Sequence, residues 1–568
     1  MSNLNTKAVA ENTFDAIVVG SGISGGFAAK ELSEKGLKTL VLERGRMVTH
    51  LEDYPTMNKD PWDFQNNNKL THLDLEDYYV QSRSGFVAED NKHFYHNDKA
   101  DPYEEKQKFD WIRADVVGGR SLLWGRQCYR WSDLDFEANA KEGIAVDWPI
   151  RYKDIEPWYG YVENYVGVSG EKLGLSHVPD GNFLPPMELN CLEKHIKKEI
   201  ESKFDFRNLT IGRVANLTQP HNGRGACQSR NRCSRGCPYG AYYSSNAVAL
   251  PDAAKTGNMT LRPNSMVHSV IYDPESGKAK GVRVIDRESK EMIEFYARII
   301  FLNASAPGTA AILLNSISDR FPNGLGNDSG ELGHNIMDHH YRLGASGTFE
   351  GFEDTYYKGR RPNGIYIPRF RNINEQTKMK EFLRGYGYQG GAGRGGWGRG
   401  TNQKDFGADF KDGLSQAGPW GFGMTGFGEV LPYHDNKMYL DQNQIDPWGL
   451  PKLVFDAGYK ENEMTMREFI KSDAAEMLEA AGLKNVRTYD NSGAIGVGVH
   501  EMGMARMGRD PKTSVLNGHN QVHAVPNVFV TDGACMTSSG TQNPSITYLA
   551  LTARAVDHAV KEMNRNNL

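Results

Sequence analysis

The sequence contains no run of about 18 apolar residues, so it predicts no membrane-spanning helix and no direct insertion into a membrane. Its first residues, MSNLNTKAVAENTF, lack the apolar segment of a secretory signal peptide, so we expect a cytoplasmic protein. Export to the periplasm together with a signal-bearing partner would leave the same sequence. A net charge of −5 offers no positive field for nucleic acid, which argues against that class of partner.

Cysteine is also scarce: 6 of 568 residues are too few for a disulfide-stabilised scaffold. The remaining composition, 39% hydrophobic and 24% charged, is typical of a globular protein. A chain of this length exceeds one ordinary domain and can bury more than one hydrophobic core.

The N-terminal region predicts a β-strand, an α-helix and a second β-strand in succession. Residues 14–20, FDAIVVG, form a short apolar run with β-branched side chains, as in a buried parallel strand. A glycine-rich turn opens the helix FAAKELSEKG, which we expect to end at Gly36. The apolar run LKTLVLE then predicts the second strand, so the region reads as a βαβ unit.

The turn in this unit, GSGISG, has the spacing of a dinucleotide-binding loop. Gly20 permits the tight turn, Gly22 lets the backbone approach a pyrophosphate, and Gly25 allows the helix to pack closely on the strand. The N-terminus of the helix directs amides and a positive dipole end at the phosphates. Glu43 ends the second strand, where a carboxylate accepts hydrogen bonds from ribose hydroxyls. This pattern predicts a dinucleotide without a 2′-phosphate and does not separate FAD from NAD.

Three later regions have patterns of their own. Residues 50–110 are polar and aromatic with little periodicity, and predict a surface excursion or a cover segment. Residues 260–303 alternate as strands separated by turn residues, and residues 340–490 contain further strand-like pieces and one long helix. Within the last region, the glycine-dense segment 386–403 predicts a mobile loop, either a surface linker or a lid over an active site.

The C-terminal region predicts a strand, NVFVTDG, followed by a final helix with a clear start. Asn543 is the expected N-cap and Pro544 the first helical residue. His500 lies in the glycine-flanked segment VGVHEMGMARMG, which predicts a turn. The final helix carries an apolar stripe for burial, formed by Ile546, Leu549, Ala553 and Val556.

Five segments, in this chain order, resemble motifs of the glucose-methanol-choline (GMC) family of FAD oxidoreductases. They are the glycine turn with ERG after the second strand, VGGRSLLWG, GELGHNIMDHH, the H-x-x-G-x-x-R-M-G segment and NPSITYLALTAR. They span nearly the whole chain. Within the family the chain most resembles the large subunits of bacterial glucoside 3-dehydrogenases and gluconate dehydrogenases, with kinship to pyranose oxidases.

The resemblance implies FAD as cofactor and assigns the catalytic positions. His500 matches the family's catalytic base, and Asn543 matches its partner position, as in pyranose oxidases. Leu123 stands where pyranose oxidases carry the histidine that bonds to the flavin, so we expect non-covalent FAD. The cofactor-binding residues expected in all are Gly20, Gly22, Gly25, Glu43, Arg44, Gly118, Gly119, Ser121, Val267, Asp532, Gly533, Asn543, Pro544 and Ser545.

Three cysteines, Cys227, Cys233 and Cys237, lie within eleven residues and precede a proline. Their spacing is similar to a segment of some FAD glucose dehydrogenases that binds a three-iron cluster, although the gap between Cys227 and Cys233 is one residue longer here. The arginines around them would favour thiolates and an anionic cluster. Reduced thiols in a turn-rich loop, or another metal, are the alternatives.

The fold expected from this resemblance is α/β (α+β overall), with a Rossmann-like FAD-binding domain and a discontinuous, sheet-based substrate domain. The FAD-binding domain is expected to comprise residues 12–50, 110–150, 215–335 and 490–568, the substrate domain residues 151–214 and 336–489, and the cover segment residues 51–109.

The activity implied is oxidation of a secondary hydroxyl of a sugar or glycoside, at carbon 3 of a pyranose, by proton abstraction and hydride transfer to flavin N5. A dehydrogenase is favoured over an oxidase, with a small subunit and an electron-acceptor protein as expected partners. The alternatives are a lyase with structural FAD and a non-catalytic flavin subunit of a larger assembly.

Overall fold

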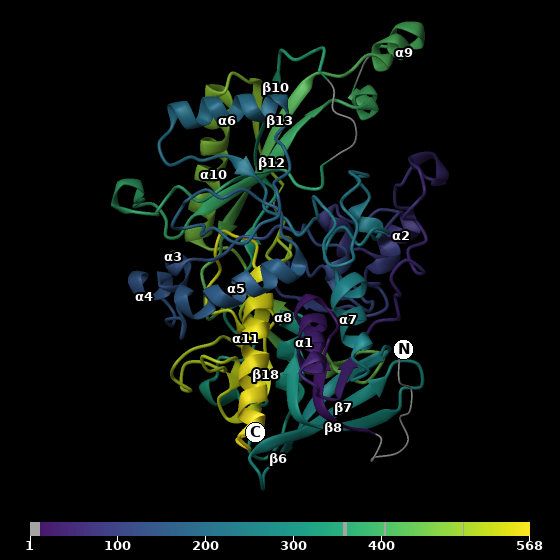
Figure 1. The fold of residues 1–568 in the computed structure, drawn as a ribbon, viewed down its shortest axis with the longest axis vertical. Coiled ribbons are helices and arrows are strands. Elements are labelled where there is room, and N and C mark those ends of the chain that lie inside the picture. The colour runs from purple at the N-terminus through teal and green to yellow at the C-terminus, as the bar shows by residue number, and fades with distance from the viewer. Residues whose placement is uncertain (1–11, 356–360, 403–404, 492) are drawn as a thin grey trace.

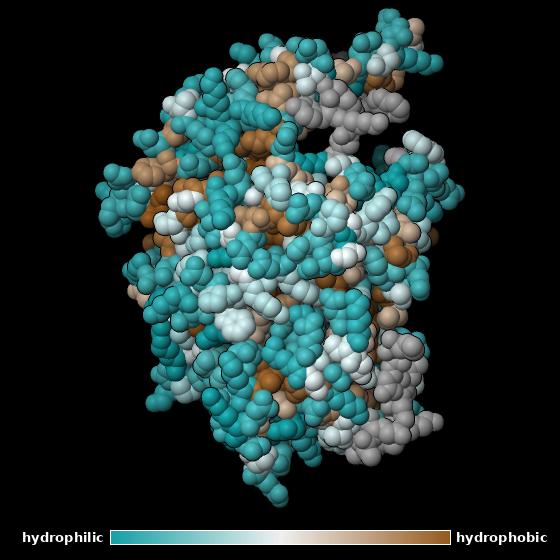
Figure 2. Space-filling view, viewed as in Figure 1, coloured by the Kyte–Doolittle hydropathy of each residue, from teal (hydrophilic) through white to brown (hydrophobic). Residues whose placement is uncertain are grey.

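The computed structural model describes residues 12–355, 361–402, 405–491 and 493–568. Two large sheets, each with its own helices, lie in opposite halves of the molecule (Figure 1). No helix within the described ranges is both long and apolar enough to cross a membrane. The face shown in Figure 2 is mainly hydrophilic, with hydrophobic residues in small separate groups.

The lower sheet in Figure 1 contains the predicted βαβ unit. Its central strand β1 (Thr13–Val19) is parallel to β2 (Thr39–Leu42) on one side and to β8 (Met292–Leu302) on the other. Helix α1 (Ile23–Glu34) joins β1 to β2, and the chain leaves it through Gly36 at φ 85°. The other strands are β5 (Met259–Arg262), parallel to β2; β18 (Val525–Val530), parallel to β8; β17 (Gln521–Val522), antiparallel to β18; and the antiparallel pair β6 (Ser265–Asp273) and β7 (Lys278–Asp286), of which β7 pairs with β8.

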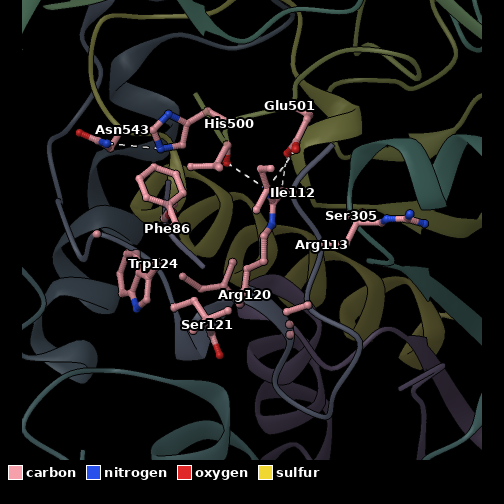
Figure 3. A pocket seen from close by; sticks show the side chains of 18 of the residues that line it. Phe86, Ile112, Arg113, Arg120, Ser121, Trp124, Ser305, His500, Glu501 and Asn543 are labelled. Atoms are coloured by element: carbon pink, nitrogen blue, oxygen red, sulfur yellow. Dashed lines mark hydrogen bonds and ion pairs between the residues drawn. The ribbon is translucent and has the colours of Figure 1, made fainter. Parts of the chain in front are cut away.

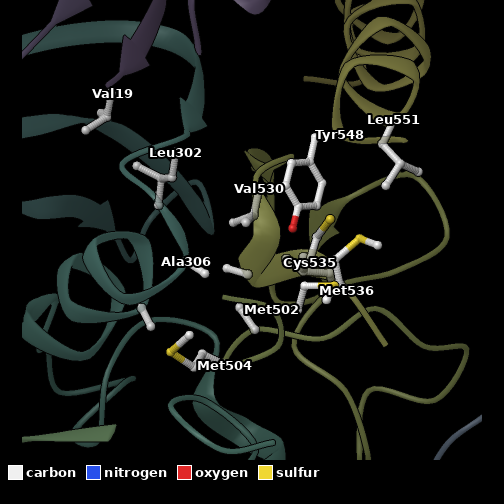
Figure 4. Packing of buried hydrophobic residues seen from close by; sticks show 14 of the residues in the cluster. Val19, Leu302, Ala306, Met502, Met504, Val530, Cys535, Met536, Tyr548 and Leu551 are labelled. Carbon is white, nitrogen blue, oxygen red and sulfur yellow. The ribbon is translucent and has the colours of Figure 1, made fainter. Parts of the chain in front are cut away.

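Helices cover this sheet and seal its core. Helix α11 (Ser545–Asn564) packs against α1 and against α5 (Tyr152–Val166), and α7 (Leu250–Lys255) also packs on α1. Helix α8 (Ala306–Asn315) packs against β6. The predicted apolar stripe of α11 is buried, and Figure 4 shows Tyr548 and Leu551 of this helix beside the strand ends. Strand residues of that cluster labelled in the figure are Val19, Leu302 and Val530.

The upper sheet has seven strands and a core of its own. Helix α10 (Glu461–Ala480) packs against the strands β10 (Leu343–Phe349), β13 (Trp420–Glu429) and β16 (Lys484–Asp490). Helix α6 (Cys191–Lys203) packs against α10 and against β12 (Tyr386–Arg394). Buried residues of α10, among them Met466 and Ile470, fill the space between helix and sheet. In order the strands are β16 (Lys484–Asp490), β10 (Leu343–Phe349), β13 (Trp420–Glu429), β12 (Tyr386–Arg394), β11 (Ile365–Ile367) and β4 (Thr210–Ile211), with β9 (His339–His340) paired to β13.

The prediction of a loop for the glycine-dense segment is wrong over its first half. Residues 386–394 form β12, a strand between β11 and β13. A Cβ at Gly390 would lie 2.0 Å from the carbonyl oxygen of Gly423 on β13, so glycine is required for this close strand contact. Composition suggested flexibility, but pairing on both sides fixes the segment. Residues 403–404, at and just beyond its end, lie outside the described residues.

Residues 51–109, expected as a surface excursion or a cover segment, are buried in part. The region has only short elements: α2 (His72–Asp77) and β3 (Glu104–Glu105), which is parallel to β15 (Pro451–Asp456). Its side chains Val80 and Phe94 are nevertheless fully buried. Their positions in the sequence follow no helix or strand periodicity, so no pattern predicted their burial. Other elements of the described ranges include β14 (Lys437–Ile445), paired with β15, and helices α3 (Asp133–Phe136), α4 (Ala138–Glu142) and α9 (Gly407–Ser415).

Candidate functional site

A cavity of about 1750 Å³ is lined by segments from both sheets. The β1–α1 turn, the segment after Gly118 and the start of α11 line it from the eight-stranded sheet, and β12 lines it from the seven-stranded sheet. Of the predicted site residues outside the cysteine group, Gly25, Gly118 and Pro544 are not in its lining. The others, which line it together, are Gly20, Gly22, Glu43, Arg44, Gly119, Ser121, Val267, His500, Asp532, Gly533, Asn543 and Ser545.

The three glycines of the turn have three different environments. Gly20 adopts φ 90°, and a Cβ there would lie 2.3 Å from the carbonyl oxygen of Asn303. A Cβ at Gly25 would lie 2.0 Å from the carbonyl oxygen of Gly20, so Gly25 allows helix and strand to pack closely. A Cβ at Gly22 would meet no protein atom within 4 Å. The space over Gly22 is therefore open, directly before the first turn of α1.

The carboxylate of Glu43, which directly follows β2, is held by hydrogen bonds from the glycine turn and from Gly45. The Glu43 carboxylate accepts hydrogen bonds from the Ser21 hydroxyl (2.6 Å) and amide (3.0 Å), and from the Gly45 amide (2.8 Å). Burial raises the pKa of Glu43 above its usual range. Arg44 is paired with Asp101 (2.8 Å) and Asp115 (3.2 Å). Because its charge is already matched, Arg44 does not create a free phosphate site.

The segment after residue 116 folds against the glycine turn. The Gly118 amide donates to the Ser21 hydroxyl (2.8 Å), and the Ser121 hydroxyl donates to the Gly118 carbonyl (2.6 Å). A Cβ at Gly118 would lie 1.6 Å from Oδ1 of Asn246, so a side chain is excluded there. Gly119 and Leu123 remain in the cavity wall.

At the start of α11 the structure corrects the predicted cap. Pro544, not Asn543, directly precedes the helix, which begins at Ser545. Pro544 already has helical dihedral angles, and the Asn543 side chain is engaged inside the cavity instead. Close by, Asp532 accepts hydrogen bonds from the Thr309 hydroxyl (2.6 Å) and the Ala534 amide (2.9 Å), and burial raises its pKa to about 6.

His500 and Asn543, 43 positions apart, meet in the cavity (Figure 3). Nδ2 of Asn543 lies 3.3 Å from Nε2 of His500. Gln389 of β12 donates from Nε2 to Oδ1 of Asn543 (2.6 Å), which turns the Asn543 amino group toward the imidazole. Burial lowers the pKa of His500 well below its usual value, and the nearby His339 and Arg120 add to this effect. His500 is therefore neutral near pH 7 and able to accept a proton.

An ion pair with a buried carboxylate lies beside the histidine. Arg120 contacts the fully buried Glu501 carboxylate through two hydrogen bonds, of 3.0 and 2.5 Å, and also donates to the Val499 carbonyl (3.3 Å). Figure 3 shows this pair between the GGRS segment and the histidine segment. The pair therefore links the segment after Gly118 to the residues on both sides of His500, Val499 and Glu501.

Sequence reasoning did not assign His339 or Asp338 to the site. Nδ1 of His339 lies 3.0 Å from Nδ1 of His500. Asp338 accepts hydrogen bonds from the amides of Gly496 (2.8 Å), Gly498 (2.9 Å) and His500 (3.0 Å), which fixes the backbone that carries His500. The signal was present, because both residues belong to the GELGHNIMDHH motif. Their contact across 161 positions was not visible in the sequence.

Aromatic side chains form part of the cavity around this group. Phe427 lies with its ring centroid 6.4 Å from that of His500, and Tyr341 lies 4.8 Å from Phe427. Phe86, from the cover segment, lies 6.4 Å from Tyr341, and Trp124 also lines the cavity. Figure 3 shows Phe86 and Trp124 beside His500 and Asn543. Planar apolar faces thus lie next to the polar side chains of His500 and Asn543.

The cysteine segment reaches the same cavity. Cys227 and Cys233 line it, and all three cysteines are free and partly buried. The expectation that nearby arginines favour thiolates is not supported: Arg235 pairs with Asp90 (2.7 Å), Arg232 with Asp60, and burial raises the pKa of Cys227. Within the described ranges, one group of three His, Cys, Asp or Glu side chains has its possible ligand atoms within 4.8 Å of one another. This group is Asp338, His339 and His500.

The residues present fit a flavin dinucleotide. The first turn of α1 has no side-chain cap, so its amides face the open space over Gly22. The buried Nδ2 of Asn303, at the cavity wall, has no hydrogen-bond partner in the described part of the chain. Gly20, Gly22, Glu43 and Gly119 are the residues that would hold the pyrophosphate and ribose.

Comparison with known proteins gives a consistent result. The model of the GMC oxidoreductase family matches residues 14–341 with its N-terminal part and 432–552 with its C-terminal part. The chain is 28% identical to a 2-methyl-1,2-propanediol dehydrogenase of Mycolicibacterium austroafricanum, over 96% of this chain and 94% of that protein. It is 24% identical to a fructose dehydrogenase large subunit of Gluconobacter japonicus, over 97% and 98%. The fold is similar to that of a pyridoxine 4-oxidase from Mesorbium loti, with a TM-score of 0.57, 16% identity and coverage of 96% and 99%.

Proposed function

The chain belongs to the GMC oxidoreductase family, and on this premise we propose that it oxidises a secondary hydroxyl of a sugar or glycoside, with carbon 3 of a pyranose as the favoured position. The family resemblance and the mixed α/β architecture predicted from the motifs are thereby confirmed. As a family member the chain is an oxidoreductase that acts on CH–OH groups, and the family implies FAD as its cofactor.

One observation carries the proposal: a neutral imidazole whose Nε2 faces the cavity beside an amide donor. In the proposed reaction, Nε2 of His500 accepts the proton of the substrate hydroxyl. The Asn543 amino group, aimed by Gln389, donates to the alkoxide oxygen that forms. When bound, FAD supplies the acceptor for the hydride that leaves the same carbon.

A sugar is favoured as substrate because the site combines planar apolar surfaces with convergent polar groups. Phe86, Tyr341 and Phe427 offer aromatic surface to the less polar face of a ring. Gln389 and Asn543 offer hydrogen bonds to its hydroxyls. Among the relatives, one is named for fructose and one for a small acyclic diol, so the substrates to compare are sugars and small alcohols.

The test is anaerobic titration of the purified, FAD-containing protein. Methyl glycosides, free pyranoses, fructose and 2-methyl-1,2-propanediol are added separately while the flavin absorbance is recorded. Loss of absorbance with pyranosides, and a 3-keto product by NMR, supports the proposal. Loss with the small diol alone would replace the sugar by a simple alcohol. No loss with any alcohol would reject hydride transfer and favour a lyase or a non-catalytic flavin subunit.

The electron acceptor and a further cofactor belong to the same proposal. The fructose relative is named as a large subunit, which supports a small subunit and an acceptor protein as partners here. Cys227, Cys233 and Cys237 would ligate an iron–sulfur cluster, since two of them line the cavity. Protein prepared without oxygen should then contain about three irons per chain. Cys233→Ser should lose them, while substrate still bleaches the flavin. Background iron in such a preparation would exclude the cluster.

A further inference from the structure

The hydrogen bonds around His339 determine which nitrogen of His500 carries the proton. His339 lies on the short strand β9, and its side chain is fully buried. Its Nε2 lies 2.5 Å from the carbonyl oxygen of Gly540. A carbonyl can only accept a hydrogen bond, so Nε2 of His339 bears hydrogen.

The charge state of His339 then fixes its other nitrogen. Burial lowers the pKa of His339 to about 4, so the ring is neutral near pH 7. A neutral imidazole with hydrogen on Nε2 has only a lone pair on Nδ1. The 3.0 Å contact between the two Nδ1 atoms therefore requires the hydrogen to come from His500.

The same constraint reaches the reacting face of His500. With hydrogen on Nδ1, the neutral His500 ring has its lone pair on Nε2. That nitrogen faces the Asn543 amino group at 3.3 Å, a contact that requires an acceptor on the imidazole. Gln389 fixes the amide orientation independently, because it donates to the Asn543 oxygen. Four side chains from distant parts of the chain thus agree on one set of proton positions.

We infer that His339 is a positioning residue that holds His500 in the tautomer with hydrogen on Nδ1 and the basic lone pair on Nε2. The Gly540 carbonyl orients His339, and His339 orients His500. Nε2 of His500 then keeps the lone pair, which faces Asn543 and takes the proton of a substrate hydroxyl that replaces this contact. Among the described residues, the hydrogen-bond partner of Nδ1 of His500 is His339, while the adjacent Asp338 accepts backbone amides on both of its carboxylate oxygens. The inference rests on the proposed function, in which His500 is the base.

Two variants of His339 test the inference, because one removes the hydrogen-bond acceptor together with the ring and the other removes the ring but keeps an acceptor. In His339→Leu the Nδ1 hydrogen of His500 loses its acceptor, and the other tautomer competes. Because His339→Leu removes one buried hydrogen bond, we expect its limiting rate of flavin bleaching to be about 10- to 100-fold lower than that of the wild type, with little change in substrate affinity. In His339→Asn the Oδ1 atom replaces the Nδ1 acceptor, so most of the rate should return. Equal rates for the two variants, or a His339→Leu rate equal to that of the wild type, would overturn the inference.

His340→Leu is the matched control. His340 is the next residue of β9, equally buried, and it points away from His500 because side chains alternate along a strand. We expect His340→Leu to lower the melting temperature without lowering the limiting rate. A rate loss equal to that of His339→Leu would mean that damage to β9, rather than the tautomer, causes the effect.

Neutron diffraction from the deuterated wild-type protein gives a readout that needs no substrate. Deuterium is expected on Nε2 of His339 and on Nδ1 of His500. Deuterium on Nδ1 of His339 would overturn the inference even if every variant misfolds. The proposed function fails separately, if no alcohol bleaches the flavin while the deuterium positions are as expected.

Discussion

Substitution of Gly22 by valine should remove the cofactor without damaging the fold. The structure places nothing within 4 Å of a Cβ at this position. Its backbone is extended, with φ −63° and ψ −161°, so a side chain introduces no left-handed strain. The added methyl groups would occupy the open space before α1, where the pyrophosphate is expected to meet the helix amides.

The magnitude follows from the contacts that the valine would block. Displacing a phosphate from two backbone amides removes two charge-assisted hydrogen bonds, each worth about 1.5–3 kcal/mol. The combined loss of about 3–6 kcal/mol corresponds to a fall in FAD affinity of roughly 10²- to 10⁴-fold. The free energy of unfolding of the cofactor-free protein should change by no more than about 0.5 kcal/mol, since a Cβ at this position meets no protein atom within 4 Å.

The assay pairs this variant with Gly25→Val, three residues away. At Gly25 a Cβ would lie 2.0 Å from the Gly20 carbonyl oxygen, so the variant should be destabilised by about 1–3 kcal/mol or more, whether or not FAD is present. Urea unfolding and FAD titration of the cofactor-free proteins distinguish the two effects. A Gly22→Val protein that is folded and binds FAD normally would refute the placement of the pyrophosphate. Equal destabilisation by both substitutions would refute the claim that the space over Gly22 is free of protein.

Four further predictions concern His500 and the ion pair beside it. His500→Ala should retain FAD and slow flavin bleaching by substrate by about 100-fold or more, measured by stopped-flow, because a positioned base is lost; a normal rate would remove His500 from the mechanism. The depressed pKa of His500 predicts a rate that is constant from pH 8 down through 6.5 and falls only in more acidic solution, as the buried ring is protonated; a fall centred near pH 6.5 would contradict a buried neutral base. Below pH 6.5 the His500 side chain takes up a proton in the unfolded protein but stays neutral in the folded protein. The free energy of unfolding should therefore fall as the pH drops below 6.5, which urea titrations at several pH values can measure. Arg120→Met should destabilise the protein by about 3–5 kcal/mol because Glu501 keeps a buried, unpaired charge, and adding Glu501→Gln should restore part of that loss; additive effects in thermal unfolding would contradict the pairing.

The local features of the cofactor-binding half were predictable from the sequence. The strand before Gly20, helix α1 and the strand before Glu43 were predicted from short-range patterns, because apolar runs, glycine turns and helix ends are encoded by neighbouring residues. His500 and Asn543 were selected by family motifs, and the structure brings them to 3.3 Å of each other. Errors near these elements were small, such as the cap residue at Pro544 instead of Asn543.

Only the tertiary structure brought the rest of the site together. His339 touches His500 across 161 positions, and Gln389 touches Asn543 across 154. Gln389 lies on a glycine-rich strand whose composition predicted a loop, since pairing with two neighbouring strands is a long-range property. Sequence alone selected His500 and Asn543 as the residues proposed to carry the chemistry. The tautomer of the base depends on a carbonyl, a buried imidazole and an amide from separate segments, and that dependence exists only once the chain has folded.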